Sequence, residues 1–343
     1  MELKSPYPYF GGKAKVAPLI WKALGDVPCF VDPFLGSAAV LLGRPAAHLA
    51  NGDRTEVVND LEGFIVNFWR AMQADVDAVA HYADYPSFEN DLHARHAWLV
   101  NKRSELSERI EGDPAYYDAK VAGWWVWGMA QWIGSGFASG NGDWIVEDGK
   151  LLHAGNTGQG VSRQLLHARN TGQGVSRQLL HAGNTGEKPL YAYMRALAKR
   201  FERVRVMCGD WQRVCKPAVM WGLNTTERGE LTGVILDPPY SHAERDNKLY
   251  NEDHDVSAEV RAFAIANGDN PKLRIVLCGY DGEHEMPATW RKVAWKAHGG
   301  YGSIATSGRG RDNKERECLW LSPHCLGCEQ VQQQLSLFAE TWG

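Results

Sequence analysis

Short apolar runs alternate with helical patterns along this chain, and this alternation restricts the possible folds more than any other feature of the sequence. Seven runs have the length and the β-branched or aromatic content that are typical of strands. They lie at residues 29–31, 48–50, 204–207, 234–236, 274–277, 293–295 and 318–321. Helical patterns between several of them, as at residues 38–42 and 61–72, predict strand-helix-strand crossovers. We therefore predict an α/β fold with a Rossmann-like, doubly wound and mostly parallel seven-stranded sheet.

The pattern changes between about residues 74 and 197, where helix-rich stretches precede a segment rich in Gly, Asn and Gln. Such a change in periodicity indicates an inserted, helix-rich domain. The predicted organisation is a first part of the α/β domain at residues 1–73, the insert at 74–197, a second part at 198–325 and a tail at 326–343.

Composition excludes several classes of protein. Apolar residues make up 44% of the 343 residues and charged residues 23%, which is typical of a globular chain rather than a disordered one. The formal net charge of −4 does not favour a polyanion, so a nucleic-acid partner would have to meet local basic clusters. Seven scattered cysteines argue against a disulfide framework and for a reducing compartment. We find no signal peptide and no membrane-spanning apolar stretch, and we expect a cytoplasmic protein.

The tetrad Asp237-Pro238-Pro239-Tyr240 directly follows the apolar run at residues 233–236. The nitrogen of an exocyclic base amine is a poor nucleophile because its lone pair is delocalised into the ring, so a catalyst has to accept both of its hydrogens. Asp237 offers one acceptor, and the extended diproline turn can present the Pro238 carbonyl as a second. Tyr240 adds a stacking face. The tetrad thus favours chemistry on a base amine, and an ordinary diproline turn after a buried strand is the alternative.

A second group of candidate residues lies nearer the N-terminus. Asp32-Pro33-Phe34-Leu35-Gly36-Ser37-Ala38 predicts a tight strand-to-helix turn, where α/β proteins place nucleotide-like cofactors. Asp53 and Asp60 follow about 20 to 30 residues later, where an acid can bind ribose hydroxyls, and Asp60 is the better candidate. Upstream, the paired glycines of Tyr9-Phe10-Gly11-Gly12-Lys13 permit close backbone approach, and Lys13 is a candidate partner for a carboxylate.

Taken in order, these motifs resemble those of the Dam-like DNA adenine N6-methyltransferases, of phage or bacterial type. The resemblance rests on the segment 9–13, on Asp32 to Ser37, on Asn59-Asp60-Leu61 and on the tetrad, and it spans about residues 6–323. In that family the cofactor motifs precede an inserted target-recognition domain, and the catalytic tetrad comes last. The resemblance implies a site-specific enzyme that transfers a methyl group from S-adenosylmethionine to the amino nitrogen of a flipped adenine in double-stranded DNA.

The resemblance also implies roles for individual residues. Asp237, Pro238 and Tyr240 would be catalytic, Lys13 and Asp32 would lie near the methionine part of the cofactor, and Asp60 would bind its ribose. The implied cofactor set is Tyr9, Phe10, Gly11, Lys13, Asp32, Phe34, Gly36, Ser37, Asp60, Asp210 and Trp211. One departure is Ala38, where the family usually has the second glycine of Gly-Ser-Gly, and this puts the closest approach of the backbone to the cofactor in doubt.

Contacts with DNA are expected at two places behind the tetrad. Flipping an adenine costs roughly a few kcal/mol and requires a closing loop, for which the polar stretch with Lys248 and Tyr250 is a candidate. Arg309 and Arg311 belong to the densest basic run, which suits phosphate contacts. A solvated linker and a solvated charged face are the respective alternatives.

The insert contains a repeat with a period of 14 residues at positions 151–187. Each full copy carries Asn, Gln and Arg, which can read base edges, among glycines that permit close approach. We therefore expect Arg163 and Arg177 to approach DNA. A recent duplication in a tolerant surface loop would produce the same repeat, so its role stays open.

Two other clusters are assigned to structure rather than to chemistry. Trp124, Trp125, Trp127 and Trp132 have helical spacing, which predicts packing of the insert against the sheet. Cys325-Leu326-Gly327-Cys328 lacks the paired second half of a structural zinc site, so we predict no metal.

The tail contains Gln334-Leu335-Ser336-Leu337-Phe338, which is similar to the pentapeptide by which bacterial polymerases and repair proteins dock on the sliding clamp. Leu335, Leu337 and Phe338 would be the apolar contacts. An amphipathic turn packed on its own domain is the alternative.

Three other functions are weighed against adenine methylation. N4-cytosine methylation uses a similar tetrad, more often with serine first. A catalytically silent DNA-binding or clamp-associated regulator would keep the fold, and Ala38 supports it. A hydride-transferring dehydrogenase would leave the tetrad without a role. The sequence does not reveal the recognised DNA motif, the oligomeric state or a partner restriction enzyme.

Overall fold

The computed structural model describes residues 3–9, 11–50, 52–132, 136–139, 144–147, 150–153, 189–220, 229–239, 256–295 and 317–327. Two compact units divide the chain. We call Met1–Gly12 with Asp60–Gly209 the helical unit, and Lys13–Asn59 with Asp210–Gly343 the sheet unit. Each unit is described separately.

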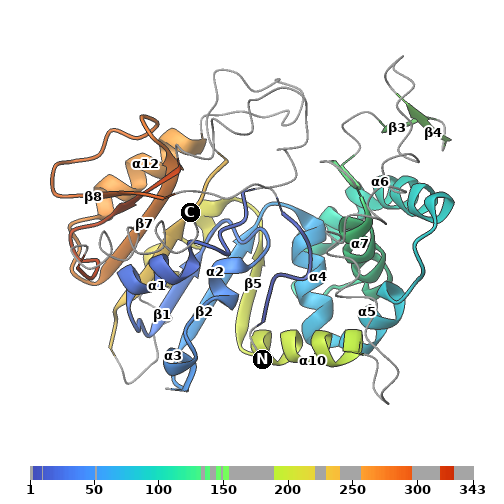
Figure 1. The fold of residues 1–343 in the computed structure, drawn as a ribbon, viewed down its shortest axis with the longest axis horizontal. Helices are drawn as coiled ribbons and strands as arrows, with labels where there is room; N and C mark the ends of the chain where they lie inside the picture. Colours follow the sequence, from blue (N-terminus) through green and yellow to red (C-terminus); the bar gives the residue numbers. More distant parts are fainter. Residues whose placement is uncertain are drawn as a thin grey trace, which may run out of the picture. The chain divides into compact units, whose positions relative to one another are not determined.

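The sheet unit contains strands and short helices in alternation (Figure 1). Its strands are β1 (Cys29–Asp32), β2 (Thr55–Asp60, whose last residue is grouped with the helical unit), β6 (Thr232–Leu236), β7 (Leu273–Tyr280), β8 (Arg291–Ala294) and β9 (Glu317–Leu321). Its helices are α1 (Ala17–Leu24), α2 (Ala39–Leu42), α3 (Ala46–Ala50), the 3-10 turn η1 (Trp211–Arg213), α11 (Pro217–Met220) and α12 (Val256–Asn267).

The seven-stranded sheet has the order β5-β2-β1-β6-β7-β9-β8, where β5 is Val204–Cys208. Strand β1 pairs in parallel with β2 and β6, and β6 pairs in parallel with β7. Strand β9 is antiparallel to both β7 and β8. Since every residue of β1 and β6 is buried, these strands read as continuous apolar runs. The predicted α/β fold with a mostly parallel seven-stranded sheet is confirmed.

One of the predicted strands is wrong. Residues 48–50 belong to helix α3, whose first turn is closed by bonds from the amides of His48 and Leu49 to the carbonyl of Pro45. The strand at this place in the chain is β2, and the sequence hides it because Glu56, Asn59 and Asp60 interrupt its apolar pattern. These polar residues are nevertheless buried.

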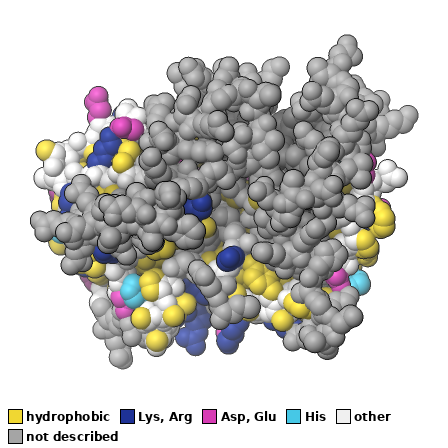
Figure 2. Space-filling model, in the orientation of Figure 1, with side chains coloured by type: hydrophobic (Ala, Val, Ile, Leu, Met, Phe, Trp, Pro, Cys, Tyr) yellow, Lys and Arg dark blue, Asp and Glu magenta, His cyan; other side chains and the backbone are white. Residues whose placement is uncertain are grey.

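The described surface carries charges of both signs. Figure 2 shows Lys and Arg side chains in small groups among hydrophobic and acidic ones on the face that it draws. This mixture agrees with the net charge of −4.

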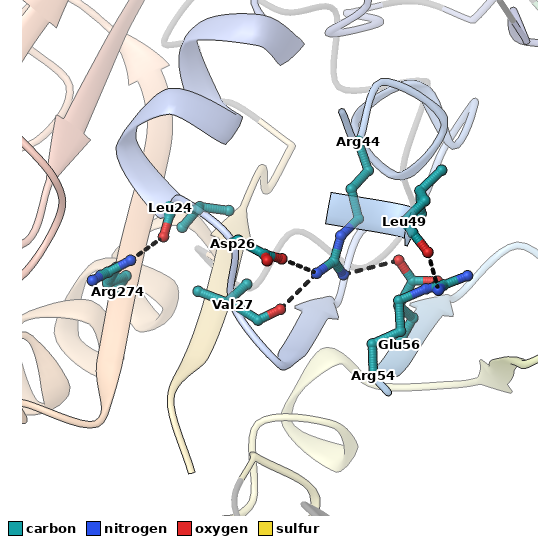
Figure 3. A network of polar contacts seen from close by, with 8 residues as sticks. All are labelled: Leu24, Asp26, Val27, Arg44, Leu49, Arg54, Glu56 and Arg274. Atoms are coloured by element: carbon teal, nitrogen blue, oxygen red, sulfur yellow. Dashed lines mark hydrogen bonds and ion pairs between the residues drawn. The ribbon is translucent and has the colours of Figure 1, made fainter. Parts of the chain in front are cut away.

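A network of polar contacts explains how Glu56 is buried within a strand (Figure 3). Nη1 of Arg44 donates to Oε1 of Glu56 at 3.1 Å, and its Nη2 donates to the carbonyl of Val27 at 2.6 Å. Asp26 accepts a weaker bond from Nη2 of Arg44 at 3.4 Å, and Arg54 lies 3.4 Å from Oε2 of Glu56. Buried charges persist only when they are paired and hydrogen-bonded, and this network meets both conditions.

The helical unit contains the helices α4 (Gly63–Ala74), α5 (Val76–Ala83), α6 (Glu89–Gly112), α7 (Ala119–Gln131) and α10 (Pro189–Phe201), together with β5 and a hairpin of β3 (Trp144–Glu147) and β4 (Lys150–His153). Side-chain caps begin three of the helices, because Glu62, Asp75 and Asp118 accept bonds from amides of the first turn. No helix among the described residues is long and apolar enough to cross a membrane.

Aromatic rings form the core of the helical unit. Trp69 stacks on Phe201 with ring centroids 3.7 Å apart, which joins α4 to α10. Trp125 and Trp127 are buried, and the ring of Trp125 contacts those of Tyr7 and Phe68 within the helical unit. The N-terminal segment is thus held against α4 and α7 through Tyr7. Packing of the tryptophans against the sheet stays a prediction.

Candidate active site

The polar residues of the sheet unit converge at one edge of the sheet. Strand β1 ends at Asp32, and Asp237 directly follows the end of β6. Strand β9 runs in the opposite direction, so its first residue, Glu317, lies opposite the last residue of β7, Tyr280. Strand β2 pairs with β1 on one side, and β6 pairs with it on the other, so the strand order reverses at β1. Open α/β sheets bind ligands at such a switch point, beyond the carboxyl ends of the strands.

The first three residues of the tetrad continue β6 into an extended segment. Leu236 and Pro238 are buried, whereas Pro239 is exposed and the side chain of Asp237 is 21% exposed. The two prolines have no amide hydrogen to donate, so this segment presents carbonyl acceptors. Tyr240 lies outside the described residues.

An ion pair joins the tetrad to the N-terminal motif. Nζ of Lys13 lies 2.9 Å from Oδ1 of Asp237, and the Lys13 side chain is only 4% exposed. Burial alone would lower the pKa of Lys13, but the attraction of Asp237, with a smaller contribution from Glu317, raises this pKa above its ordinary value. Lys13 is therefore a cation near neutral pH, and it supplies positive charge beside the Asp237 carboxylate.

The turn after β1 is fixed by its own polar groups. Oδ1 of Asp32 accepts a bond from the amide of Phe34 at 3.2 Å. The side-chain amide of Asn59 donates to the carbonyl of Pro33 at 3.1 Å, and the backbone carbonyl of Asn59 accepts from Leu35 at 2.9 Å. The end of β2 thus holds the turn that follows β1.

Two positions of this turn have a left-handed backbone. Gly36 has φ of 48°, and Ala38 has φ of 59° with ψ of 18°. Ser37 between them is buried. Ala38 therefore adopts the conformation that favours glycine, so the departure noted in the sequence occupies a strained position rather than an ordinary one.

Phe34 contributes to an aromatic group within the sheet unit. Its ring is stacked near that of Trp211, with centroids 6.2 Å apart and planes at 28°, and Phe263 contacts Trp211 edge to face at 5.5 Å. Asp210 begins the η1 turn by accepting a bond from the amide of Gln212 at 2.8 Å. Nε1 of Trp211 is buried and has no hydrogen-bond partner among the described residues.

The remaining described candidates belong to the helical unit. Asp60 is 9% exposed, and its Oδ1 accepts a bond from the amide of Glu62 at 2.9 Å. Tyr9 is 41% exposed, and Gly11 has φ of 76°. Burial raises the pKa of Tyr7, and the nearby negative charge of Asp60 raises it further, so Tyr7 remains a neutral phenol.

Residues 9–118 match the family model of the D12 class N6 adenine-specific DNA methyltransferases. Over this segment the chain is similar to that family, which supports the family that the motifs predicted. The matched segment contains the candidates from Tyr9 to Asp60, but it ends before Asp210 and Asp237. Comparison with curated proteins gives no significant match.

The D12 class, which this segment matches, methylates adenine N6 in DNA. The structure brings Lys13 to Asp237 and Phe34 to Trp211. Several other predicted residues lie outside the described part of the chain. They are Phe10, Arg163, Arg177, Tyr240, Lys248, Tyr250, Arg309, Arg311 and the five residues Gln334 to Phe338.

Sequence reasoning missed Glu317 and Cys278. Cys278 lies in β7 near the ion pair, and burial, together with the charge of Asp237, raises its pKa well above the ordinary value, so it is a neutral thiol. Glu317 follows a charged stretch, and only its position at the start of the antiparallel β9 would have marked it. Among the described residues, no group of three or more His, Cys, Asp or Glu side chains is arranged to hold a metal.

Proposed function

We propose that this chain transfers a methyl group from S-adenosylmethionine to the N6 amine of an adenine that is flipped out of double-stranded DNA. The observation that carries this proposal is the Lys13 and Asp237 ion pair beside the carboxyl end of β6. It joins the N-terminal motif of a D12-class chain to the acid of the tetrad.

The donors present in the sheet unit fit the cofactor. Phe34 and Trp211 offer apolar ring faces for an adenine, and the buried Nε1 of Trp211 is a donor with no partner among the described residues. Lys13 and Asp32 would bind the charged groups of the methionine part, and Asp60 would bind the ribose. When bound, S-adenosylmethionine supplies the electrophilic methyl group.

Asp237 and the Pro238 carbonyl would accept the two hydrogens of the adenine amine, which turns the nitrogen lone pair toward the incoming methyl group. Both acceptors bind more strongly as positive charge develops on that nitrogen, so they stabilise the transition state more than the ground state. The methylated amine then loses one proton to Asp237 or to water. The ion pair with Lys13 holds the Asp237 carboxylate in place before the substrate arrives.

Sequencing of DNA from cells that express the chain, with detection of modified bases, tests this function. We expect N6-methyladenine in one short motif, and its loss in Asp237→Ala. Asp281→Ala is the matched control, because Asp281 is an exposed acid that pairs with Lys292. N4-methylcytosine in place of N6-methyladenine would reject the proposed substrate.

Calorimetry separates an enzyme from a silent DNA-binding regulator. We expect S-adenosylmethionine to bind the wild-type chain and Asp237→Ala alike, and about tenfold more weakly to Trp211→Ala, because one good aromatic stacking contact contributes about 1 to 3 kcal/mol. Intact DNA binding without cofactor binding would favour the regulator.

The contacts with DNA are proposed from the sequence alone. Arg163 and Arg177 in the insert, and Lys248, Tyr250, Arg309 and Arg311 near the tetrad, are the proposed DNA-binding residues. Arginines that contact only phosphates would weaken binding equally for all sequences when replaced by Ala, whereas base contacts would relax the recognised motif.

We also propose that the tail docks on a sliding clamp through Gln334, Leu335, Ser336, Leu337 and Phe338. Deletion of these residues should leave methylation of short duplexes intact and abolish binding to purified clamp. Retention of clamp binding would reject this docking. A nucleoid-associated location in the cytoplasm follows from a DNA substrate.

A further inference from the structure

Two carboxylates lie on either side of β7 at the active edge of the sheet. Asp237 follows Leu236, which is paired with Leu277 of β7. Glu317 is paired with Tyr280, three residues further along the same strand and on its other side. The two acids and the Lys13 ammonium are close enough for each to change the ionisation of another.

One oxygen atom of the Glu317 carboxylate, Oε2, is buried without a hydrogen-bond partner among the described residues. Burial raises the pKa of Glu317, the charge of Lys13 lowers it, and the charge of Asp237 raises it again. A glutamate without a role would avoid this cost by turning toward solvent.

The proposed reaction creates a charge imbalance at this edge. Lys13 is buried and needs a counter-charge throughout. During methyl transfer the substrate amine also becomes positive. Asp237 carries a single negative charge, so it cannot neutralise both cations, and a second carboxylate nearby would restore neutrality.

We propose that Glu317 is a positioning residue that shares the Lys13 ammonium with Asp237, so that Lys13 remains paired while Asp237 binds the substrate amine. This inference rests on the proposed function. Glu317 itself does not touch the reacting atoms, and it acts through Lys13.

Four described charged or titratable groups interact electrostatically with Glu317. They are Lys13 of the N-terminal motif, Asp237 of the tetrad, Cys278 of β7 and Cys318 of β9. Burial raises the pKa of both thiols, so they are neutral below about pH 8. Burial raises the pKa of Glu317, so its ionisation changes above the usual range of a carboxyl group.

Steady-state kinetics of Glu317→Gln test the role in catalysis. We expect kcat to fall by about tenfold or more while KM for DNA changes by less than about threefold, because a transition-state charge is affected and binding is not. The acidic limb of the wild-type pH profile should lie above pH 4.5, since the pKa of Glu317 is raised above that value, and Glu317→Gln should lack this limb. Glu317→Asp should keep the limb and recover part of kcat.

Glu230→Gln is the matched control, because Glu230 forms an exposed ion pair with Lys272 and should have wild-type kinetics. An active wild-type chain whose kcat and pH profile are unchanged by Glu317→Gln overturns the inference. A wild-type chain that methylates no DNA rejects the proposed function instead.

A stability cycle tests the shared pairing without any activity. Asp237→Asn, Glu317→Gln and the double variant are unfolded in urea at pH 7. If one lysine is shared, either acid alone keeps Lys13 paired, and the double variant should lose more stability than the two single variants together. Losses that simply add would overturn the shared pairing.

Discussion

Lys13 and Asp237 lie in the two separate sequence segments of the sheet unit, yet Nζ of Lys13 lies 2.9 Å from Oδ1 of Asp237. The cation enters from the segment before α1, and the acid follows the central strand β6. The pair therefore ties the N-terminal motif, which lies in the segment similar to the D12 class, to the tetrad.

Replacement of Lys13 by Met should destabilise the sheet unit by about 3 kcal/mol, because the change leaves Asp237 and Glu317 without their cation. The pKa of Lys13 is raised in the folded chain above its ordinary 10.5. Its stabilisation is therefore fully present below pH 10.5 and is lost as the pH rises through the higher, folded-state pKa.

Urea unfolding between pH 7 and pH 11 measures this dependence. The difference between wild type and Lys13→Met should be constant up to about pH 10 and should shrink above it. Lys15→Met is the control, since Lys15 is exposed and should cost less than about 0.5 kcal/mol. Equal losses for the two variants would show that the ion pair contributes nothing.

The left-handed backbone at Ala38 predicts that two substitutions there differ in their effect on stability. Ala38→Gly removes the left-handed strain, which stabilises the folded chain. It also removes a buried methyl group and raises the entropy of the unfolded chain, and both of these effects destabilise. The free energy of unfolding should therefore change by less than about 1 kcal/mol. Ala38→Val places a β-branched side chain in the left-handed region and should cost at least about 2 kcal/mol. Equal stabilities in thermal unfolding would show that the turn relaxes.

Arg44 and Glu56 form a buried pair whose loss should be asymmetric. Arg44→Met leaves Glu56 and the Val27 carbonyl without their main donor and should cost about 3 to 5 kcal/mol. Adding Glu56→Gln should recover part of this loss, because the unpaired buried charge is removed. Arg54→Met, at the edge of the same network, should cost about 1 kcal/mol or less, and urea unfolding of the set ranks these variants.

Three of the strands that the sequence predicts correctly are almost wholly buried. β1, β6 and β7 read as apolar runs because the side chains on both faces of these strands are buried. β2 could not be found in this way, because its buried Glu56 is neutralised by Arg44, which lies on a separate segment. A local pattern cannot show a partner that only the fold supplies.

The candidate site could likewise be predicted only in part. Asp237 and Lys13 were predicted from motifs, since each belongs to a short, distinctive string of residues. Their pairing with each other was not predicted, because it depends on where α1 and β6 lie in the sheet unit. Glu317 was missed because a single glutamate after basic residues reads as solvated surface, and only the antiparallel register of β9 brings it to the edge.

Close packing of α5 against α7 makes a final prediction for the helical unit. A Cβ at Gly123 would lie 2.7 Å from the backbone oxygen of Val79 and against the Cβ of Tyr82, and neither backbone atoms nor a Cβ can move aside alone. Gly123→Ala should therefore destabilise the chain by about 1 to 3 kcal/mol, although alanine favours helix. Gly112→Ala is the control, since a Cβ there meets no atom within 4 Å, and it should be neutral or stabilising. Thermal unfolding in which both variants are stabilised would show that the two helices can separate without cost.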